Sequence, residues 1–211
     1  FLEPPLRRLI RNELLGGGLL LVLTAGITVV LAALLLTGAY ALHPYAGSFV
    51  AIILSWSCLA ARSLQRESGL VAGALAAGDL PLARKQLSFI VGRDTTELEE
   101  PEIWRGAVET VAENSSDGVV APLFYLMLGG PLLGLAYKAV NTLDSMVGYR
   151  NEKYLLFGRA SARCDDLLNF IPARLSGILM VIAAPFIGLN MKNSWRIMRR
   201  DGRKHSSPNS G

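Results

Sequence analysis

The sequence predicts an all-α, polytopic helical membrane protein with a soluble helical segment between its second and third spans. Hydrophobic residues make up 51% of the chain, and the mean hydropathy is +0.37. No residue between Glu13 and Arg62 carries a formal charge, and shorter uncharged runs cover 118–137 and 175–191. Because a charge at the centre of a bilayer is costly, membrane spans largely exclude charged side chains.

The long uncharged run, residues 14–61, predicts two N-terminal spans. Each pass through the hydrocarbon core needs about 20 apolar residues. Gly38, His43 and Pro44 interrupt the apolar pattern, so we expect the turn there. The arginines that precede the run are typical of a cytoplasmic flank.

Residues 62–117 predict a soluble segment made of short helices. We expect helices at 64–77, 81–90 and 101–114. The Gly78-Asp79 pair suits the end of the first helix, and a proline suits the first turn of the second.

The stretch 118–147 predicts a broken or re-entrant hydrophobic element, because Gly129-Gly130-Pro131 lies in its middle. In lipid, such a break is tolerated only where protein or a water-filled cavity satisfies the backbone. The remaining predicted parts are a polar segment at 148–174, a last span at 175–191 and a basic tail at 192–211.

The charge distribution leaves two topologies open. If every apolar run crosses once, the positive-inside rule places 138–175 outside the cytoplasm, because the N-terminus, the 62–117 segment and the tail carry more Lys and Arg. A re-entrant 118–147 would keep that segment inside. We expect residues 1–211 to form a single membrane-embedded domain. Since the chain begins with Phe1 and stops in a polar loop, we expect it to be a fragment of a longer protein.

Acidic residues form a stripe before the third apolar run. Glu109, Glu113 and Asp117 recur at steps of four, so on a helix their carboxylates share one face. Like charges at this spacing repel, and a divalent cation or a shared proton would offset the repulsion. With Asn114 beside them, these residues are our candidate metal ligands. The alternative is a solvated acidic face.

A second polar face follows the same apolar run. Lys138, Asn141 and Asp144 are spaced at steps of three, and ionisable groups at membrane depth are functional candidates by default. They are our candidate catalytic residues. The alternatives are a neutralising Lys138–Asp144 pair, or a helix that has emerged into water by Lys138.

A third cluster surrounds the start of the last apolar region. Arginine guanidinium groups bind phosphate through paired N–H donors. The alternative is a basic loop neutralised by its own carboxylates. The candidate substrate-binding residues are Arg159, Arg163, Asp165, Asp166 and Asn169, together with His205 in the tail. The net charge of +4 fits basic cytoplasmic loops, and we expect no nucleic-acid partner.

Several ordered motifs resemble adenosylcobinamide-phosphate synthase, the CobD/CbiB family of cobalamin biosynthesis. The resemblance rests on Gly92-Arg-Asp-Thr, Glu109-Thr-Val-Ala-Glu-Asn-Ser-Ser-Asp-Gly118, Tyr137-Lys-Ala-Val-Asn-Thr-Leu-Asp-Ser-Met146, Gly158-Arg-Ala-Ser-Ala-Arg163 with Asp165-Asp166, and Ser207-Pro-Asn-Ser-Gly211.

The resemblance implies an enzyme of the bacterial or archaeal cell membrane, the inner membrane in a Gram-negative organism. It would join aminopropanol or its phosphate to adenosylcobyric acid through an amide, with ATP consumed and Mg²⁺ as cofactor. The acidic stripe would hold Mg²⁺ and the nucleotide. Lys138, Asn141 and Asp144 would place the acyl group and receive the amine's proton. The arginines would bind the amine's phosphate, and Asp165 and Asp166 would orient them or add to metal binding. Expected partners are the corrinoid and amine substrates, membrane lipid, and either further copies of the chain or other cobalamin-assembly enzymes.

Two other functions stay open. A Mg-dependent membrane prenyl- or phosphoalcohol-transferase would also place acidic stripes at helix ends. A transporter could use an intramembrane Lys/Asp relay, although such proteins often carry an internal repeat and we find none.

Overall fold

The computed structural model describes residues 2–149 and 151–202 and confirms the predicted all-α membrane fold. Four helical stretches within these residues are long and apolar enough to cross a membrane by length and composition. The chain divides into two compact units, residues 1–59 with 120–211 and residues 60–119. The helices are α1 (Glu3–Leu9), α2 (Glu13–Leu42), α3 (Pro44–Ser57), α4 (Ala61–Ala76), α5 (Leu80–Ser88), α6 (Glu100–Ser115), the π-helix η1 (Ser116–Val120), α7 (Ala121–Val147), α8 (Arg159–Ala183), the 3₁₀ helix η2 (Ala184–Ile187) and α9 (Met191–Asp201).

The first unit begins with the predicted pair of apolar helices. The Asn12 side chain caps α2 by accepting hydrogen bonds from the N–H groups of Leu14 and Leu15. α2 ends at the predicted break, where His43 is extended and its Nδ1 accepts from the Tyr45 N–H at 3.2 Å. Most of α2 and α3 is apolar and exposed in the monomer, as expected of helices that face lipid or other spans.

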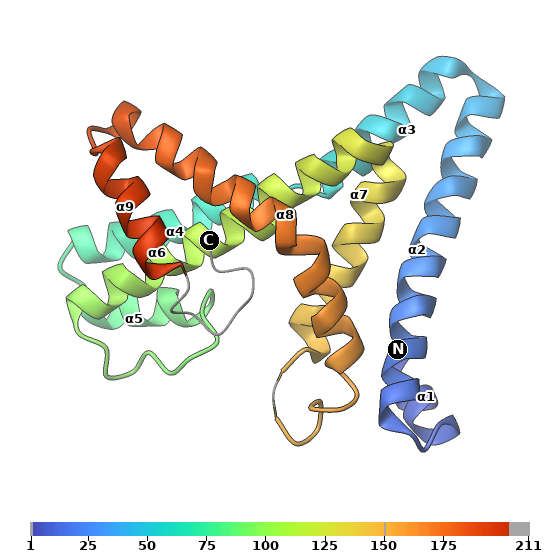
Figure 1. The fold of residues 1–211 in the computed structure, drawn as a ribbon, viewed down its shortest axis with the longest axis horizontal. Helices are drawn as coiled ribbons and strands as arrows, with labels where there is room; N and C mark the ends of the chain where they lie inside the picture. The colour runs from blue at the N-terminus through green and yellow to red at the C-terminus, as the bar shows by residue number, and fades with distance from the viewer. Residues whose placement is uncertain (1, 150, 203–211) are drawn as a thin grey trace. The chain divides into compact units, whose positions relative to one another are not determined.

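α7 is broken at the predicted glycines. Gly129 (φ −149°, ψ 23°) and Gly130 (φ 61°, ψ −158°) leave helical geometry, and the chain changes direction sharply there (Figure 1). The Tyr125 and Tyr137 rings stack with centroids 5.0 Å apart. Twelve residues of continuous helix would separate them by about 18 Å. The two halves of α7 therefore fold back on each other as a helical hairpin.

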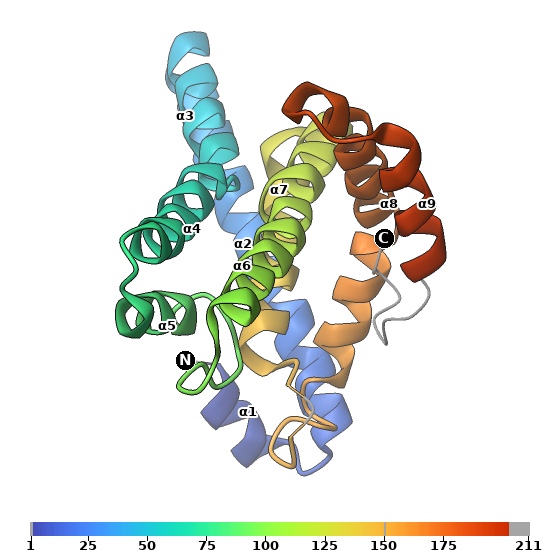
Figure 2. The same ribbon diagram turned by 90° about the vertical axis from the view of Figure 1, so that its left-hand side faces the viewer.

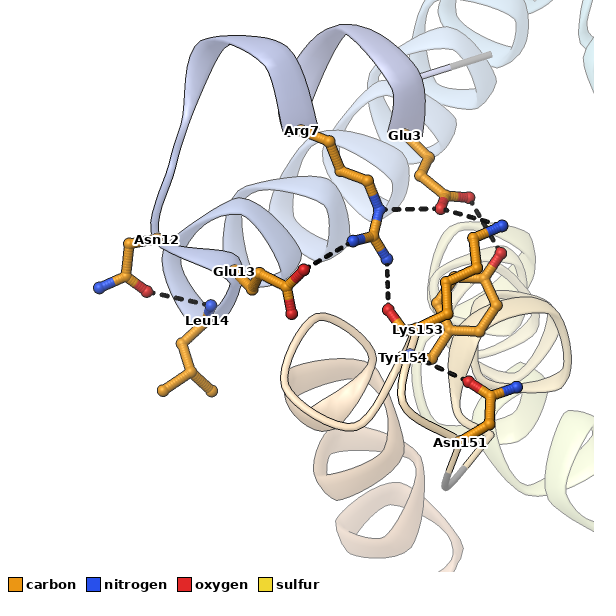
Figure 3. Close-up of polar contacts among 8 residues, drawn as sticks. All are labelled: Glu3, Arg7, Asn12, Glu13, Leu14, Asn151, Lys153 and Tyr154. Atoms are coloured by element: carbon orange, nitrogen blue, oxygen red, sulfur yellow. Dashed lines mark hydrogen bonds and ion pairs between the residues drawn. The ribbon is translucent and has the colours of Figure 1, made fainter.

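The loop between α7 and α8 is fixed against the N-terminus. Arg7 on α1 donates through Nη2 to the Lys153 carbonyl oxygen at 2.7 Å (Figure 3). Its guanidinium also lies 4.1 Å from the centre of the Phe157 ring. Phe157 is fully buried beside Leu6 and Leu20. A Cβ at Gly17 would collide with the Phe157 carbonyl oxygen, so glycine is required for this close approach.

These contacts bear on the two topologies that the charge distribution leaves open. The loop after α7 packs against α1 and the first turns of α2, so it lies at the N-terminal end of α2. The contacts favour the re-entrant 118–147, in which the chain turns back at the glycine break, over the single crossing that would place 138–175 on the opposite side from the N-terminus. The side of the membrane that this loop faces stays a prediction.

α8 differs from the predicted division into a polar segment and a span. It begins at Arg159, inside the predicted polar segment, and runs continuously to Ala183. Its first half could be helical despite its polar side chains because Ser161, Asp165 and Asn169, at steps of four, point to one buried face. The predicted basic tail begins with a helix, α9, and the rest of it, including His205, lies outside the described residues.

The second unit has its own core of short helices. The helices α4, α5 and α6 are labelled in Figure 2. They pack around Val71, Leu87 and Ile103, all three fully buried. Glu99 and Glu102 form a capping box at the start of α6. The observed helices match the expected ones at 64–77, 81–90 and 101–114 to within three residues at each end.

Candidate functional site

A buried carboxylate lies between α7 and α8. Asp165 Oδ1 accepts a hydrogen bond from Asn141 Nδ2 at 3.3 Å, and Oδ2 accepts from Asn169 Nδ2 at 2.9 Å. Asp165 is 7% exposed and Asn169 1% exposed. A buried charge is costly unless it is hydrogen-bonded, and here both carboxylate oxygens have donors.

The two amides extend this contact into a longer network. Tyr137 donates its hydroxyl hydrogen to Asn169 Oδ1 at 2.9 Å, and Lys138 Nζ approaches Asn141 Oδ1 at 3.4 Å. Asn141 therefore stands between an ammonium group and a carboxylate, with its oxygen toward the first and its nitrogen toward the second. We call Tyr137, Lys138, Asn141, Asp165 and Asn169 the polar network.

Helical spacing explains why these residues meet. Tyr137 and Lys138 lie one turn before Asn141 on α7, and Asp165 lies one turn before Asn169 on α8. One turn earlier on α8, the fully buried Ser161 hydroxyl has no hydrogen-bond partner in the described part of the chain. A buried hydroxyl of this kind is free to bind a water molecule or a ligand.

Tyr137 was not among the candidate site residues predicted from the sequence. It was counted as the end of the apolar run, although its position four residues before Asn141 places it on the same face. Its stacking on Tyr125 depends on the hairpin, which no local pattern reveals.

Asp144 lies at the edge of the polar network. It is half-buried one turn after Asn141, and the Gly148 N–H donates to its backbone carbonyl at 2.6 Å. A Cβ at Gly148 would collide with Asp144 Oδ1, so glycine makes room for the carboxylate. The alternative of a Lys138–Asp144 ion pair is not supported: across residues 2–149 and 151–202, no such pair lies within 4.0 Å.

The predicted phosphate-binding arginines lie on the outside of α8. Arg159 and Arg163 occupy its first two turns and are exposed. The expected contact that orients them through Asp165 is not formed, because both oxygens of this carboxylate are bound by amides. The structure brings Asn141, Asp165 and Asn169 together and leaves the arginines free to approach a solvent-borne ligand.

The acidic stripe belongs to the second unit. Glu109 pairs with Arg93 at 3.2 Å, Asn114 donates through Nδ2 to the Thr110 carbonyl, and Glu113 is exposed. The π-helix η1 begins at Ser116 and offsets the half-buried Asp117 from the α-helical stripe. The widened turn directs the Gly118 carbonyl to the Ala60 N–H at 2.9 Å.

The stripe offers few ligands for a metal ion. Among the residues whose positions are described, no group of three or more His, Cys, Asp or Glu side chains could hold one. Mg²⁺ is commonly held by only one or two carboxylates, with phosphate oxygens and water as its other ligands. The stripe fits that mode of binding and does not fit a metal enclosed by protein ligands alone.

In the second unit, the Gly92-Arg-Asp-Thr motif contains a carboxyl group with a shifted pKa, that of Asp94. The Thr96 backbone N–H and hydroxyl both donate to Asp94 Oδ1, at 2.9 and 2.8 Å. These hydrogen bonds stabilise the ionised form and lower the pKa of the Asp94 carboxyl. The motif is thus a self-capped turn, which positions Arg93 toward Glu109.

Comparison with known proteins gives consistent matches. The family model described as "CobD/Cbib protein" matches residues 1–211. "Cobalamin biosynthesis protein CobD" of Geobacter metallireducens is 66% identical over 210 residues, covering 100% of this chain and 66% of that protein. Its namesakes in Pelobacter propionicus and Listeria monocytogenes are 59% and 50% identical, covering 100% and 92% of this chain. The chain thus spans just under two thirds of the length of these curated relatives, and no solved structure matches it.

Proposed function

Because the chain belongs to the CobD/CbiB family of cobalamin biosynthesis proteins, we propose that it carries the active site of a membrane-bound, ATP-dependent, amide-forming enzyme. The reaction would join aminopropanol or its phosphate to adenosylcobyric acid, giving adenosylcobinamide or its phosphate. The enzyme would reside in the bacterial or archaeal cell membrane, which is the inner membrane in Gram-negative organisms.

The polar network is the observation that carries the proposal. Amide formation needs an activated acyl group, an amine that has lost its proton, and donors for the oxyanion of the tetrahedral intermediate. The amine nitrogen forms the new C–N bond, the activating group leaves with its electron pair, and a base takes the amine's proton. The network offers a cation, oriented amide donors and a carboxylate at one place between α7 and α8.

Each member would have a defined role. Lys138 and the Asn141 amide would lie against the acyl oxygen, and Asp144, half-buried at the edge of the network, would receive the amine's proton. Asp165 would act through its contact with Asn141, as a positioning residue. Asn169 and Tyr137 hold Asp165 from the other side.

The substrates would enter from the end of α2 where the N-terminus lies. Exposed Arg159 and Arg163 would bind the phosphate of the amine substrate, with Asp166 beside them, since guanidinium groups match phosphate oxygens. His205 would join this group of substrate-binding residues. This end of α2 also carries Arg7, Arg8 and Arg11, which supports a cytoplasmic location and access to ATP.

The acidic stripe would hold the nucleotide. Glu113 and Asp117 would bind Mg²⁺, with Asn114 and Glu109 in support, and the ion would neutralise phosphate charge when bound. Glu109 is already held by Arg93, whereas Glu113 is exposed on the same helix and would be the principal glutamate ligand. Copies of the chain or other cobalamin-assembly enzymes would be its protein partners.

The direct test follows amide formation by the full-length protein in detergent, with adenosylcobyric acid, aminopropanol phosphate and Mg-ATP. We expect the amide product, and we expect Asp117→Asn to abolish turnover while membrane insertion is unchanged. Glu100→Gln, an exposed change at the start of α6, the helix that leads into η1, serves as the control. Retained activity in Asp117→Asn would remove its metal role.

Other outcomes would favour the rival functions. No amide, with uptake of a substrate into vesicles, would indicate a transporter that uses the network as a relay. No amide, with Mg-dependent release of diphosphate from a prenyl or phosphoalcohol donor, would indicate the transferase.

A further inference from the structure

An open cavity of about 280 Å³ lies between α2 and the second half of α7, and Lys138 is one of the residues that line it. Thr24 and Thr28 line it from α2, and Lys138 and Thr142 line it from α7. The rest of its wall is apolar and includes Leu135 and Met146. The proposed function uses only the network side of Lys138.

The cavity lies deep along a membrane helix. Thr24 and Thr28 are about 16 and 22 Å along α2 from Glu13, at 1.5 Å per residue, in a hydrocarbon core about 30 Å thick. A cation at this depth is costly unless an anion or several acceptors stabilise it. Within the described ranges, no carboxylate lies within 4.0 Å of Lys138 Nζ, and its hydrogen bond to Asn141 Oδ1 is long, at 3.4 Å.

The hydroxyls add donors beside the ammonium. Thr28 donates to the Thr24 carbonyl at 2.8 Å, so its hydrogen is already used. The Thr24 and Thr142 hydroxyls have no hydrogen-bond partner in the part of the chain that the structure describes. One ammonium and two free hydroxyls in an apolar wall select a ligand with an anionic end on a short apolar arm.

We propose that this cavity binds the carboxylate-bearing arm of the corrinoid acid, with Lys138 and Thr24 as its carboxylate contacts. The inference rests on the proposed function and names the subsite for the acyl donor. Pockets that enclose whole small molecules usually measure about 300–1,000 Å³. The cavity therefore admits the arm and leaves the macrocycle outside. A carboxylate bound at Lys138 would lie next to the polar network, because Lys138 Nζ also contacts Asn141 Oδ1.

The test is equilibrium binding of adenosylcobyric acid to the full-length protein without ATP, in competition with adenosylcobinamide, whose arm ends in an amide. We expect the wild type to prefer the acid. Thr24→Val should weaken binding of the acid about tenfold, since a hydrogen bond to a charged group is worth about 1.5–3 kcal/mol. Lys138→Met should remove the preference for the acid over the amide.

Thr37→Val is the matched control. Thr37 lies on the same helix and donates to the Ala33 carbonyl at 2.8 Å, outside the cavity. We expect it to bind as the wild type does. Equal binding of acid and amide by the wild type would overturn the proposal, as would equal weakening by Thr24→Val and Thr37→Val.

Binding and catalysis separate the two proposals. Selective binding of the acid that depends on Thr24, without amide formation, would overturn the proposed function and leave the carboxylate site standing. Amide formation by the wild type, together with unchanged binding of the acid in Thr24→Val and Lys138→Met, would overturn the carboxylate site and leave the proposed function standing.

Discussion

Arg7 donates a hydrogen bond through Nη2 to the carbonyl oxygen of Lys153, at 2.7 Å (Figure 3). The same guanidinium donates to Glu3 at 3.0 Å and to Glu13 at 2.9 Å, so all three of its nitrogens are used. Tyr154 adds a bond from its hydroxyl to Glu3. This cluster connects the N-terminus to the loop that leads into α8, and so brings the first turns of α8 to the N-terminal end of α2.

The first prediction concerns sidedness. Cysteine at position 160, in a protein whose Cys58 and Cys164 are replaced by alanine, should react with a membrane-impermeant thiol reagent in sealed inverted vesicles. The reason is that Ala160 follows the loop held by Arg7, on the side we assign to the cytoplasm.

Right-side-out vesicles should protect the same cysteine, and detergent should expose it in both preparations. Labelling from the periplasmic side alone would contradict the hairpin reading of 118–147.

The second prediction concerns Arg7 itself. Arg7→Ala should destabilise the protein by an amount on the order of 2 kcal/mol, because hydrogen bonds to charged partners are lost and Glu13 loses its ion-pair partner. Faster tryptic cleavage after Lys153 and a lower unfolding temperature in detergent would report it. Arg8→Ala, an exposed neighbour on the same helix, should leave both unchanged. If the two variants behave alike, the cluster does not hold the loop.

The third prediction concerns the hairpin break. Gly130 adopts φ 61° and ψ −158°, a region that is essentially restricted to glycine. Gly130→Ala should therefore cost about 1–3 kcal/mol, measured as a fall in thermal stability in detergent. Gly26→Ala lies in the middle of α2, where an added Cβ meets nothing within 4 Å. This control should be neutral or slightly stabilising, and an equal fall in both would count against the break as a specific requirement.

The fourth prediction concerns acid sensitivity in the second unit. The Thr96 hydrogen bonds lower the pKa of Asp94 in the folded state. A lowered pKa means that the stabilisation is present above the pKa of the unfolded chain and is lost as pH falls through the folded value. Hydrogen exchange of the Thr96 amide should accelerate, relative to its intrinsic rate, below about pH 4. Asp94→Asn should abolish this pH dependence, and a dependence that persists would assign it to another group.

Much of the fold was predictable, because local chemistry decides it. A long uncharged run interrupted at His43 and Pro44 predicts two apolar helices, and Gly129-Gly130 directly before Pro131 favours a break, whereas the glycines at 16–18 continue as helix. Whether the chain continues onward or folds back at this break was not predictable, since it depends on the contact between Tyr125 and Tyr137 across the turn.

The sequence predicted several residues of the site but not the hydrogen bonds between them. Asn141, Asp165 and Asn169 were candidates from their place in polar stretches. The pairing of Asp165 with amides, where arginines were expected, follows from which face of α8 meets α7. From the sequence, Arg7 was interpreted only as a positive charge beside a membrane span. Its contacts with Lys153 and Phe157 were not predictable, because these residues lie far along the chain.

The central claim is that the polar network forms the amide-making site, and its most direct test is turnover by full-length Asn141→Leu. This change keeps the side chain's approximate size and removes the bridge between Lys138 and Asp165. The initial rate of adenosylcobinamide phosphate formation should fall by about 10²–10³-fold, as on loss of an oriented donor to a transition state. The variant should still elute from a sizing column and show an unfolding transition as the wild type does. Wild-type turnover by this variant would contradict the claim.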